Sequence, residues 1–108
     1  MARKIAKARG GIGRWYATVE GRELPCVHKC FWSGGIYRDP NFKPYVFKWQ
    51  DLYKRLQATN EAIITTDEIV DGQPVARIGY VAVFAVFDIK AQDGILSFAT
   101  GDRLCDLE

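Results

Sequence analysis

The stretch Ile78–Phe87, which reads IGYVAVFAVF, is the longest apolar run of the chain and decides its fold class. The run is half as long as the roughly 20 residues that a membrane-spanning helix needs. It is rich in β-branched and aromatic residues, so it predicts a buried β-strand. Both faces of this strand are apolar, which places it at the centre of a sheet, covered by sheet on one side and by a helix on the other.

Two Asp-Gly pairs flank this strand and predict tight hairpins at its ends. This dipeptide is favoured in the two-residue turn that joins antiparallel strands, and it occurs at Asp71–Gly72 and at Asp93–Gly94. As a straight strand, Val75–Ile89 would span roughly 50 Å, too long for one small domain. We therefore expect a bulge or bend at Gly79. The predicted meander consists of Ala62–Val70, Val75–Ile89 and Ile95–Ala99.

The period of the apolar residues changes before the meander and indicates an α-helix. Five apolar side chains fall on one helical face, because they recur at the three- and four-residue spacings of a helix. They are Tyr45, Trp49, Leu52, Tyr53 and Leu56. The pattern predicts a helix from about Tyr45 to Ala58, with Pro44 in its first turn and Asn60 at its end.

The N-terminal half predicts a hairpin and then a loop. Residues 15–20 alternate between two faces as a strand does, and Glu20–Arg22 supplies a turn. Leu24–Trp32 is the predicted returning strand. Its Pro25 has no N–H, so that end should lie at a sheet edge or outside the ladder. Ser33–Pro44 carries two glycines and two prolines and predicts a long loop.

The length of 108 residues and the 48% hydrophobic content predict one domain with a core of its own. We expect an α+β fold: a curved, mostly antiparallel five-stranded sheet, which could close into a small barrel, with one covering helix. Residues 1–13 are predicted to form a flexible basic N-terminal arm and residues 14–106 a single globular domain. We interpret residues 107–108 as a remnant of an expression tag.

The charges are divided between the two halves of the chain. Residues 1–60 hold 12 Lys and Arg against 4 acids, a net charge of +8, whereas residues 61–108 hold 3 against 9, a net charge of −6. Ten of the 14 aromatic residues lie in the basic half. Cationic side chains among flat rings are what a surface needs to hold a phosphate backbone and stack its bases.

This distribution favours a small non-catalytic module that binds single-stranded or structured nucleic acid, DNA or RNA. The arm would attract the strand, other cations would contact phosphates, and exposed rings would stack bases. The candidate residues are Arg3, Lys4, Lys7, Arg9, Arg14, Tyr16, Lys29, Phe31, Trp32, Tyr37 and Arg38. The alternative is a protein-interaction or self-assembling subunit, a homo-oligomer for instance, that uses charge complementarity or a sheet edge.

A small enzyme or metal site around Cys26, His28 and Cys30 is the remaining alternative. On a straight strand the two cysteines would lie about 13 Å apart, too far for one zinc ion or for a disulfide. His28 is the only histidine, and the sequence shows no preferred carboxylate to orient it. We therefore expect these three residues to be structural, and we expect no catalytic residue and no bound metal.

The glycine clusters lack the order and partners of a nucleotide-binding loop, so no cofactor is expected either. Three cysteines without framework spacing indicate free thiols and a reducing, cytoplasmic location. The chain shows neither a signal peptide nor a membrane-spanning segment, so we expect no membrane partner.

Overall fold

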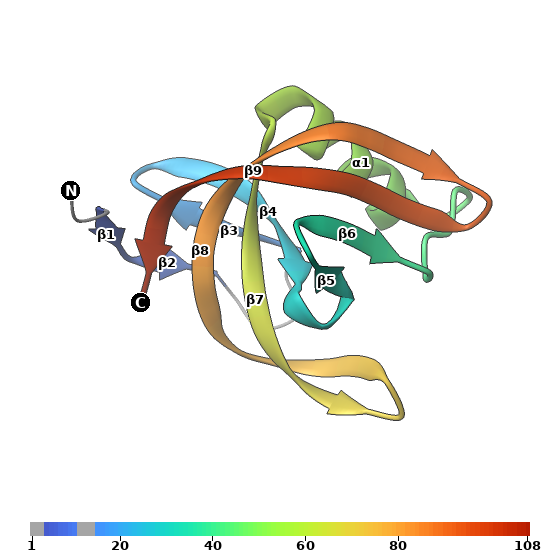
Figure 1. Ribbon diagram of the computed structural model, residues 1–108, viewed down its shortest axis with the longest axis horizontal. Coiled ribbons are helices and arrows are strands. Elements are labelled where there is room, and N and C mark those ends of the chain that lie inside the picture. The colour runs from blue at the N-terminus through green and yellow to red at the C-terminus, as the bar shows by residue number, and fades with distance from the viewer. Residues whose placement is uncertain (1–3, 11–14) are drawn as a thin grey trace.

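A computed structural model describes residues 4–10 and 15–108 of the chain (Figure 1). In these residues one α-helix accompanies a nine-stranded, mostly antiparallel sheet, so the predicted α+β class is confirmed. The elements are β1 (Ile5–Ala6), β2 (Ala8–Arg9), β3 (Tyr16–Val19), β4 (Arg22–His28), the 3₁₀ helix η1 (Lys29–Phe31), β5 (Trp32–Ser33), β6 (Ile36–Asp39), α1 (Phe47–Thr59), β7 (Glu61–Val70), β8 (Gln73–Gln92) and β9 (Ile95–Leu107).

The strands follow the order β2-β3-β4-β7-β8-β9-β6-β5, and β1 pairs with β9 away from this path. The pairs β4–β7 and β1–β9 are parallel, and the other pairs are antiparallel. A parallel pair needs a long crossover connection. Between β4 and β7 that crossover contains η1, β5, β6 and α1, which brings them all to one side of the molecule (Figure 1).

Two parts of the predicted fold were wrong. The sheet has nine strands rather than five, and it is not closed into a barrel, because its terminal strands β2 and β5 are not paired with each other. The loop predicted over Ser33–Pro44 contains most of the β5–β6 hairpin. Gly34 and Gly35 have φ of 59° and 80°, the left-handed conformation at both central positions that a type I′ hairpin turn requires.

The long strand β8 is internal to the sheet, as the apolar run predicts, because it pairs with β7 and β9. Its bends are bulges, but they lie beside the predicted position rather than on it. Gly79 itself pairs with Thr66 of β7. The residues that the β7–β8 register skips are Val75, Ile78 and Val81. These bulges bend the hairpin away from the rest of the sheet (Figure 1).

Helix α1 begins two residues later than predicted and ends at Thr59, one residue after the predicted Ala58, with the predicted Asn60 as its cap. Asn60 has a φ of 54°, and its N–H donates to the carbonyl of Leu56 at 2.9 Å, a left-handed C-terminal cap. Pro44 lies outside the helix, two residues before the N-cap residue Val46. Leu52 and Leu56 are buried on the helix face that packs on β4, β7 and β8.

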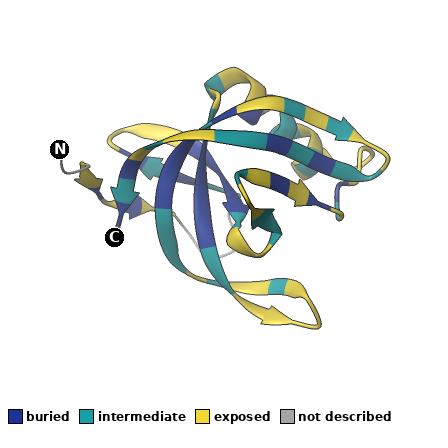
Figure 2. Ribbon diagram, viewed as in Figure 1, coloured by how far each residue is buried: buried dark blue, intermediate teal, exposed yellow. Residues whose placement is uncertain are grey.

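Strands β7 and β8 separate two apolar cores, and Figure 2 shows both strands dark where they cross the middle of the molecule. Alternate residues of each strand serve opposite faces. Ile64 and Ala82 belong to the core that includes α1 and β6. Ile63 and Val83 belong to the core that includes β1, β2 and β3. The predicted strand beginning at Leu24 ends at His28, because Lys29–Phe31 form η1.

Within residues 4–10 of the predicted flexible arm, β1 and β2 are paired in the sheet. Ala6 and Ala8 are each 9% exposed, and the N–H of Asp106 donates to the carbonyl of Lys4 at 2.9 Å. The small side chains of Ala6 and Ala8 pack in the core, whereas their charged neighbours Lys7 and Arg9 are exposed. Leu107, interpreted above as a tag remnant, pairs with Ala6 and is buried, so it is part of the fold. Residues 1–3 and 11–13 of the predicted arm lie outside the described residues.

Candidate functional site

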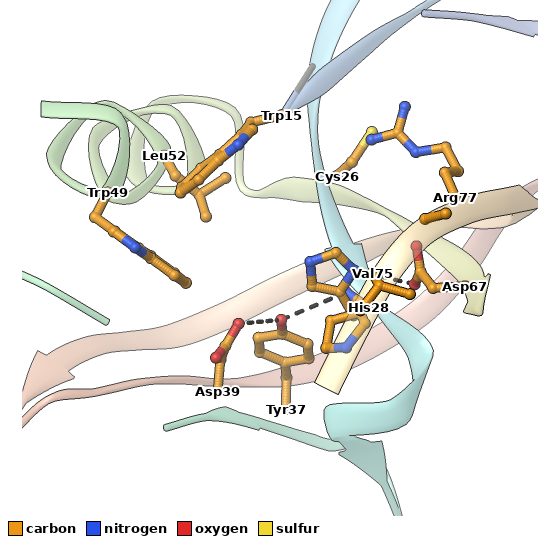
Figure 3. A pocket seen from close by; sticks show the side chains of 12 residues that line it. Trp15, Cys26, His28, Tyr37, Asp39, Trp49, Leu52, Asp67, Val75 and Arg77 are labelled. Carbon is orange, nitrogen blue, oxygen red and sulfur yellow. Dashed lines mark hydrogen bonds and ion pairs between the residues drawn. The ribbon is translucent and has the colours of Figure 1, made fainter. Parts of the chain in front are cut away.

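The chain folds around a cavity of about 320 Å³ that lies between α1, the end of β4 and the β7–β8 hairpin (Figure 3). This is at the lower end of the roughly 300–1,000 Å³ range of small-molecule sites. Leu52 of α1 and Pro74, Val75 and Ala76 of β8 line the cavity together with the residues described below. The bulge at Val75 is one of those that bend β8, so the register shifts of this hairpin shape the cavity wall.

Two tryptophans form the aromatic wall of the cavity. The rings of Trp15, the residue before β3, and Trp49, on α1, meet edge to face, with centroids 4.9 Å apart and planes at 78°. Trp49 also packs edge to face on the buried Phe42, at 5.6 Å. Each ring is therefore held by another ring. Figure 3 shows Trp15 and Trp49 together on one side of the cavity.

A histidine–carboxylate pair lies on another side of the cavity. Nδ1 of His28 is 3.0 Å from Oδ2 of Asp67, and Thr65 donates its hydroxyl to the same oxygen at 3.0 Å. The Asp67 side chain is 3% exposed, whereas that of His28 is 36% exposed. A carboxylate oxygen only accepts hydrogen bonds, so Nδ1 carries the proton and Nε2 is the acceptor of the neutral ring.

A second carboxylate, Asp39 of β6, completes the polar lining. It accepts a hydrogen bond from the hydroxyl of Tyr37 at 3.0 Å and another from the N–H of Asn41 at 3.0 Å, and it is 2% exposed. The Tyr37 hydroxyl is 3.4 Å from the N–H of His28, from which it accepts. Burial, with the charge of Asp39 as a smaller cause, raises the pKa of the Tyr37 phenol well above its ordinary value.

The thiols near the cavity are not activated. Burial raises the pKa of Cys26 to about 11, although the charge of Arg77 acts in the opposite direction. Cys30 is exposed, but partial burial of its thiol also raises its pKa. Only thiolates are good nucleophiles, so neither residue suits nucleophilic catalysis near neutral pH. Within the described residues, no three His, Cys, Asp or Glu side chains come together as metal ligands would.

The structure divides the predicted nucleic-acid-binding residues into two groups at opposite ends of β9. Lys4, Lys7 and Arg9 are exposed around β1 and β2, and β1 pairs with Asp106 and Leu107. Strand β6, which carries Arg38, pairs with residues 96–99. About 30 Å of strand separates these ends. Lys4 is also ion-paired with Glu20, and Arg3 and Arg14 lie outside the described residues.

Two of the predicted stacking residues have covered rings. Tyr37 is 1% exposed and stacks on Phe98 at 4.7 Å, so its inclusion as a base-stacking residue is corrected. It lies on the inward face of β6, whereas Ile36 and Arg38 alternate outward. The ring of Tyr16 is half-buried, and the guanidinium of Arg55 lies 4.1 Å from its centroid.

A subset of the predicted residues does meet on η1, β5 and β6. Phe31 and Arg38 line one open hollow of about 440 Å³ on the outer side of β6. Lys29 is exposed on the same 3₁₀ helix as Phe31. Trp32 is half-buried, donates from Nε1 to Thr100 at 3.0 Å and packs on Phe84, so much of its ring serves the core.

Sequence reasoning missed the residues that form the cavity with His28. Asp67 orients the histidine, and the parallel β4–β7 pairing that brings the two together has no local sequence signal. The sequence holds one signal that could have indicated them: Thr65 and Asp67 are polar residues in a strand whose first half is apolar. Part of the charge on the two halves is neutralised within the fold, because Arg22 of the basic half pairs with Glu61 of the acidic half.

Comparison of the chain with protein-family models, curated proteins and solved structures found no match. Among the described residues, no helix has both the length and the apolar character to cross a bilayer. The residues of the cavity are therefore the basis for a functional proposal.

Proposed function

We propose that this protein is a non-catalytic binding module that holds a small organic ligand in the cavity between α1, β4 and the β7–β8 hairpin. The observation that carries the proposal is the combination of two mutually packed indole rings with polar groups that are already fixed by partners. Such an apolar cavity with a few convergent polar groups is the usual form of a ligand site. The polar groups would fix the orientation of the ligand, and the indole rings would supply contact area.

The state of the titratable groups supports binding rather than catalysis. The pKa of Cys26 is about 11 and that of Tyr37 is raised well above its ordinary value, so both groups stay protonated near neutral pH. His28 has an orienting carboxylate, but its geometry pairs it with no activated nucleophile among the described residues. The His28–Asp67 pair would instead present Nε2 as a fixed hydrogen-bond acceptor.

The test is an NMR titration of the full chain with small organic probes that cover anionic, neutral and cationic classes. At least one class should shift the indole N–H signals of Trp15 and Trp49 in a saturable way. Trp32 is a built-in control, because its indole N–H is bound to Thr100 and it does not line the cavity. Saturable shifts that avoid both cavity tryptophans, or no shifts with any class, would refute the proposal.

Binding of a nucleic-acid strand is the second candidate function, and the hollow shared by Phe31 and Arg38 favours it. A ring beside an exposed cation such as Arg38 can stack a base while the cation holds the adjacent phosphate. The surface is small. It does not include Tyr37, nor Lys4, Lys7 and Arg9 around the distant β1 and β2. The second candidate therefore concerns Lys29, Phe31 and Arg38, with Trp32 at the margin.

Anisotropy of labelled single-stranded DNA and RNA at two salt concentrations tests this second candidate. Arg38→Ala should weaken binding and reduce the salt slope by about one. Arg103→Ala is the matched control, since Arg103 is ion-paired with Asp106 and lies outside the hollow. Binding that is absent at low salt, or equally weakened by both variants, would remove η1 and β6 from consideration as a nucleic-acid surface.

A further inference from the structure

Asp39 is a buried carboxylate without a cationic partner in the described part of the chain. Its two hydrogen-bond donors, the Tyr37 hydroxyl and the Asn41 N–H, are both neutral. The ion pairs among residues 4–10 and 15–108 do not include it. Buried charges in proteins are usually paired. Asp39 lines the cavity, so a ligand in the cavity can supply the missing charge.

The walls beside this carboxylate have the chemistry that organic cations prefer. The face of an indole ring is the strongest cation–π acceptor among side chains. Trp15 and Trp49 lie at 78° to each other, so they enclose a corner rather than a slot. Figure 3 shows Asp39 at the same side of the cavity as Trp49. A compact cationic group fits such a corner better than an extended flat ring does.

The other charged groups of the cavity do not remove this preference. Asp67 is bound to His28 and Thr65. Arg77 lies over the ring of Tyr80, 5.3 Å from its centroid, and donates to the Tyr80 hydroxyl at 3.2 Å. Figure 3 shows Arg77 and Asp67 on the side of the cavity away from Trp49. The charged side chains of the lining thus include two carboxylates, Asp39 and Asp67, and one guanidinium, Arg77.

We infer that the ligand of the cavity is an alkylammonium cation, with its charge beside Asp39 and its apolar part against Trp15 and Trp49. The inference rests on the proposed ligand-binding function of this cavity and adds the ligand class. Asp39 has acceptor capacity left after its two neutral donors, since an ionised carboxylate offers about four lone-pair sites. A primary ammonium would donate hydrogen bonds to these sites. A quaternary ammonium would instead be attracted by the negative charge of Asp39 and by the faces of the indole rings.

The experiment compares two cations with neutral molecules of nearly the same shape. Choline is matched by 3,3-dimethylbutan-1-ol and n-butylammonium by butan-1-ol, each titrated into the full chain while the indole signals are followed. We expect at least one cation to bind about tenfold or more tightly than its neutral match. A neutral match that binds equally well would overturn the cation inference and leave the cavity as a ligand site.

Two further results have different consequences. Binding of neutral or anionic probes alone would also overturn the inference while the proposed function stands. Failure of every probe to shift the cavity tryptophans would overturn both. The two experiments together therefore separate an incorrect ligand class from an incorrect site.

Asp39→Asn tests the role of the carboxylate, because it keeps the shape and removes the charge. The preference for the cation over its neutral match should fall to about one, with neutral binding retained. A retained preference would contradict the assignment of Asp39. Trp49→Leu provides a second variant, which should weaken cation binding about tenfold. Trp32→Leu, at a half-buried tryptophan away from the cavity, should leave it unchanged, and thermal unfolding verifies that each variant is folded.

Discussion

Nδ1 of His28 lies 3.0 Å from Oδ2 of Asp67, although the two residues are 39 positions apart in the chain. The contact joins the end of β4 to the interior of its parallel neighbour β7, because His28 pairs with Thr65 and Thr65 is itself bonded to Asp67. The sheet thus holds the imidazole in one orientation at the cavity. A binding group that is fixed before the ligand arrives costs less entropy on binding.

This geometry predicts the tautomer of His28. At a pH where the ring is neutral, the proton should reside on Nδ1, and ¹⁵N chemical shifts of the imidazole should report Nε2 as the unprotonated nitrogen. His28 is the only histidine, so its signals are unambiguous. Asp67→Ala should abolish this preference. Protonation on Nε2 in the unmodified protein would contradict the hydrogen bond to Asp67.

Removal of the Tyr37 hydroxyl should lower the stability of the fold. Tyr37→Phe leaves the ring stack on Phe98 in place but deprives buried Asp39 of one donor and the N–H of His28 of its acceptor. The free energy of unfolding should fall by about 1–3 kcal/mol in denaturant titrations. Tyr45→Phe is the control, because Tyr45 is 79% exposed, and its effect should stay within about 0.5 kcal/mol. Equal effects would show that the Tyr37 hydroxyl has no stabilising role.

The three free thiols should differ in their reactivity toward an alkylating agent. In the native protein Cys30 should be modified first, because it is exposed whereas Cys26 and Cys105 are buried. With a pKa of about 11, Cys26 would be about 0.1% thiolate at pH 8 even if the reagent reached it. Peptide mapping after a short iodoacetamide reaction should find one modified cysteine, and Cys30→Ser should remove it.

The pH dependence of this reaction has a definite sign. Burial raises the pKa of Cys30, so less thiolate is present at a given pH than in a free cysteine. The native alkylation rate should therefore still rise with pH above 9.0, the pKa of an unperturbed thiol. A rate that levels off below that pH, or early modification of Cys26, would show that the thiol surroundings differ from those described.

The elements with local signals could be predicted from the sequence. The hairpins at Asp71–Gly72 and Asp93–Gly94 depend on residues that accept a positive φ, and the end of α1 depends on Asn60 in the same conformation. The hairpin at Gly34–Gly35 carried the same signal, but the prolines and large side chains around it favoured a loop. Its two-residue strand β5 is too short to show alternation.

The candidate site could not be predicted, because long-range pairing assembles it. Asp39 is buried only because β6 pairs with β9, which turns Asp39 and Tyr37 inward. Trp15 and Trp49 meet only because α1 packs beside β4. Aromatic and basic composition indicated a surface, whereas packing placed Tyr37 in a core and covered Tyr16 with Arg55. Composition does not record which face of a strand is inward.

The pairing of residues 4–10 predicts a contrast between two neighbouring positions of β1. Ala6 is 9% exposed and Ile5 is 66% exposed, so Ala6→Asp would bury a charge and Ile5→Asp would not. Ala6→Asp should detach β1 from β9. The amide of Asp106, which donates to the carbonyl of Lys4, should then lose at least about tenfold of its hydrogen-exchange protection.

Amides of Ile63 and Val83 in the sheet centre provide the internal reference for this experiment. They should keep their protection in Ala6→Asp if only β1 detaches, because local opening leaves the β7–β8 ladder intact. Ile5→Asp should leave Asp106 protected. An unprotected Asp106 amide in the unmodified protein would mean that residues 4–10 behave as the mobile arm that their composition predicts. Protection that Ala6→Asp removes would show instead that the burial of Ala6 is needed to keep β1 paired with β9.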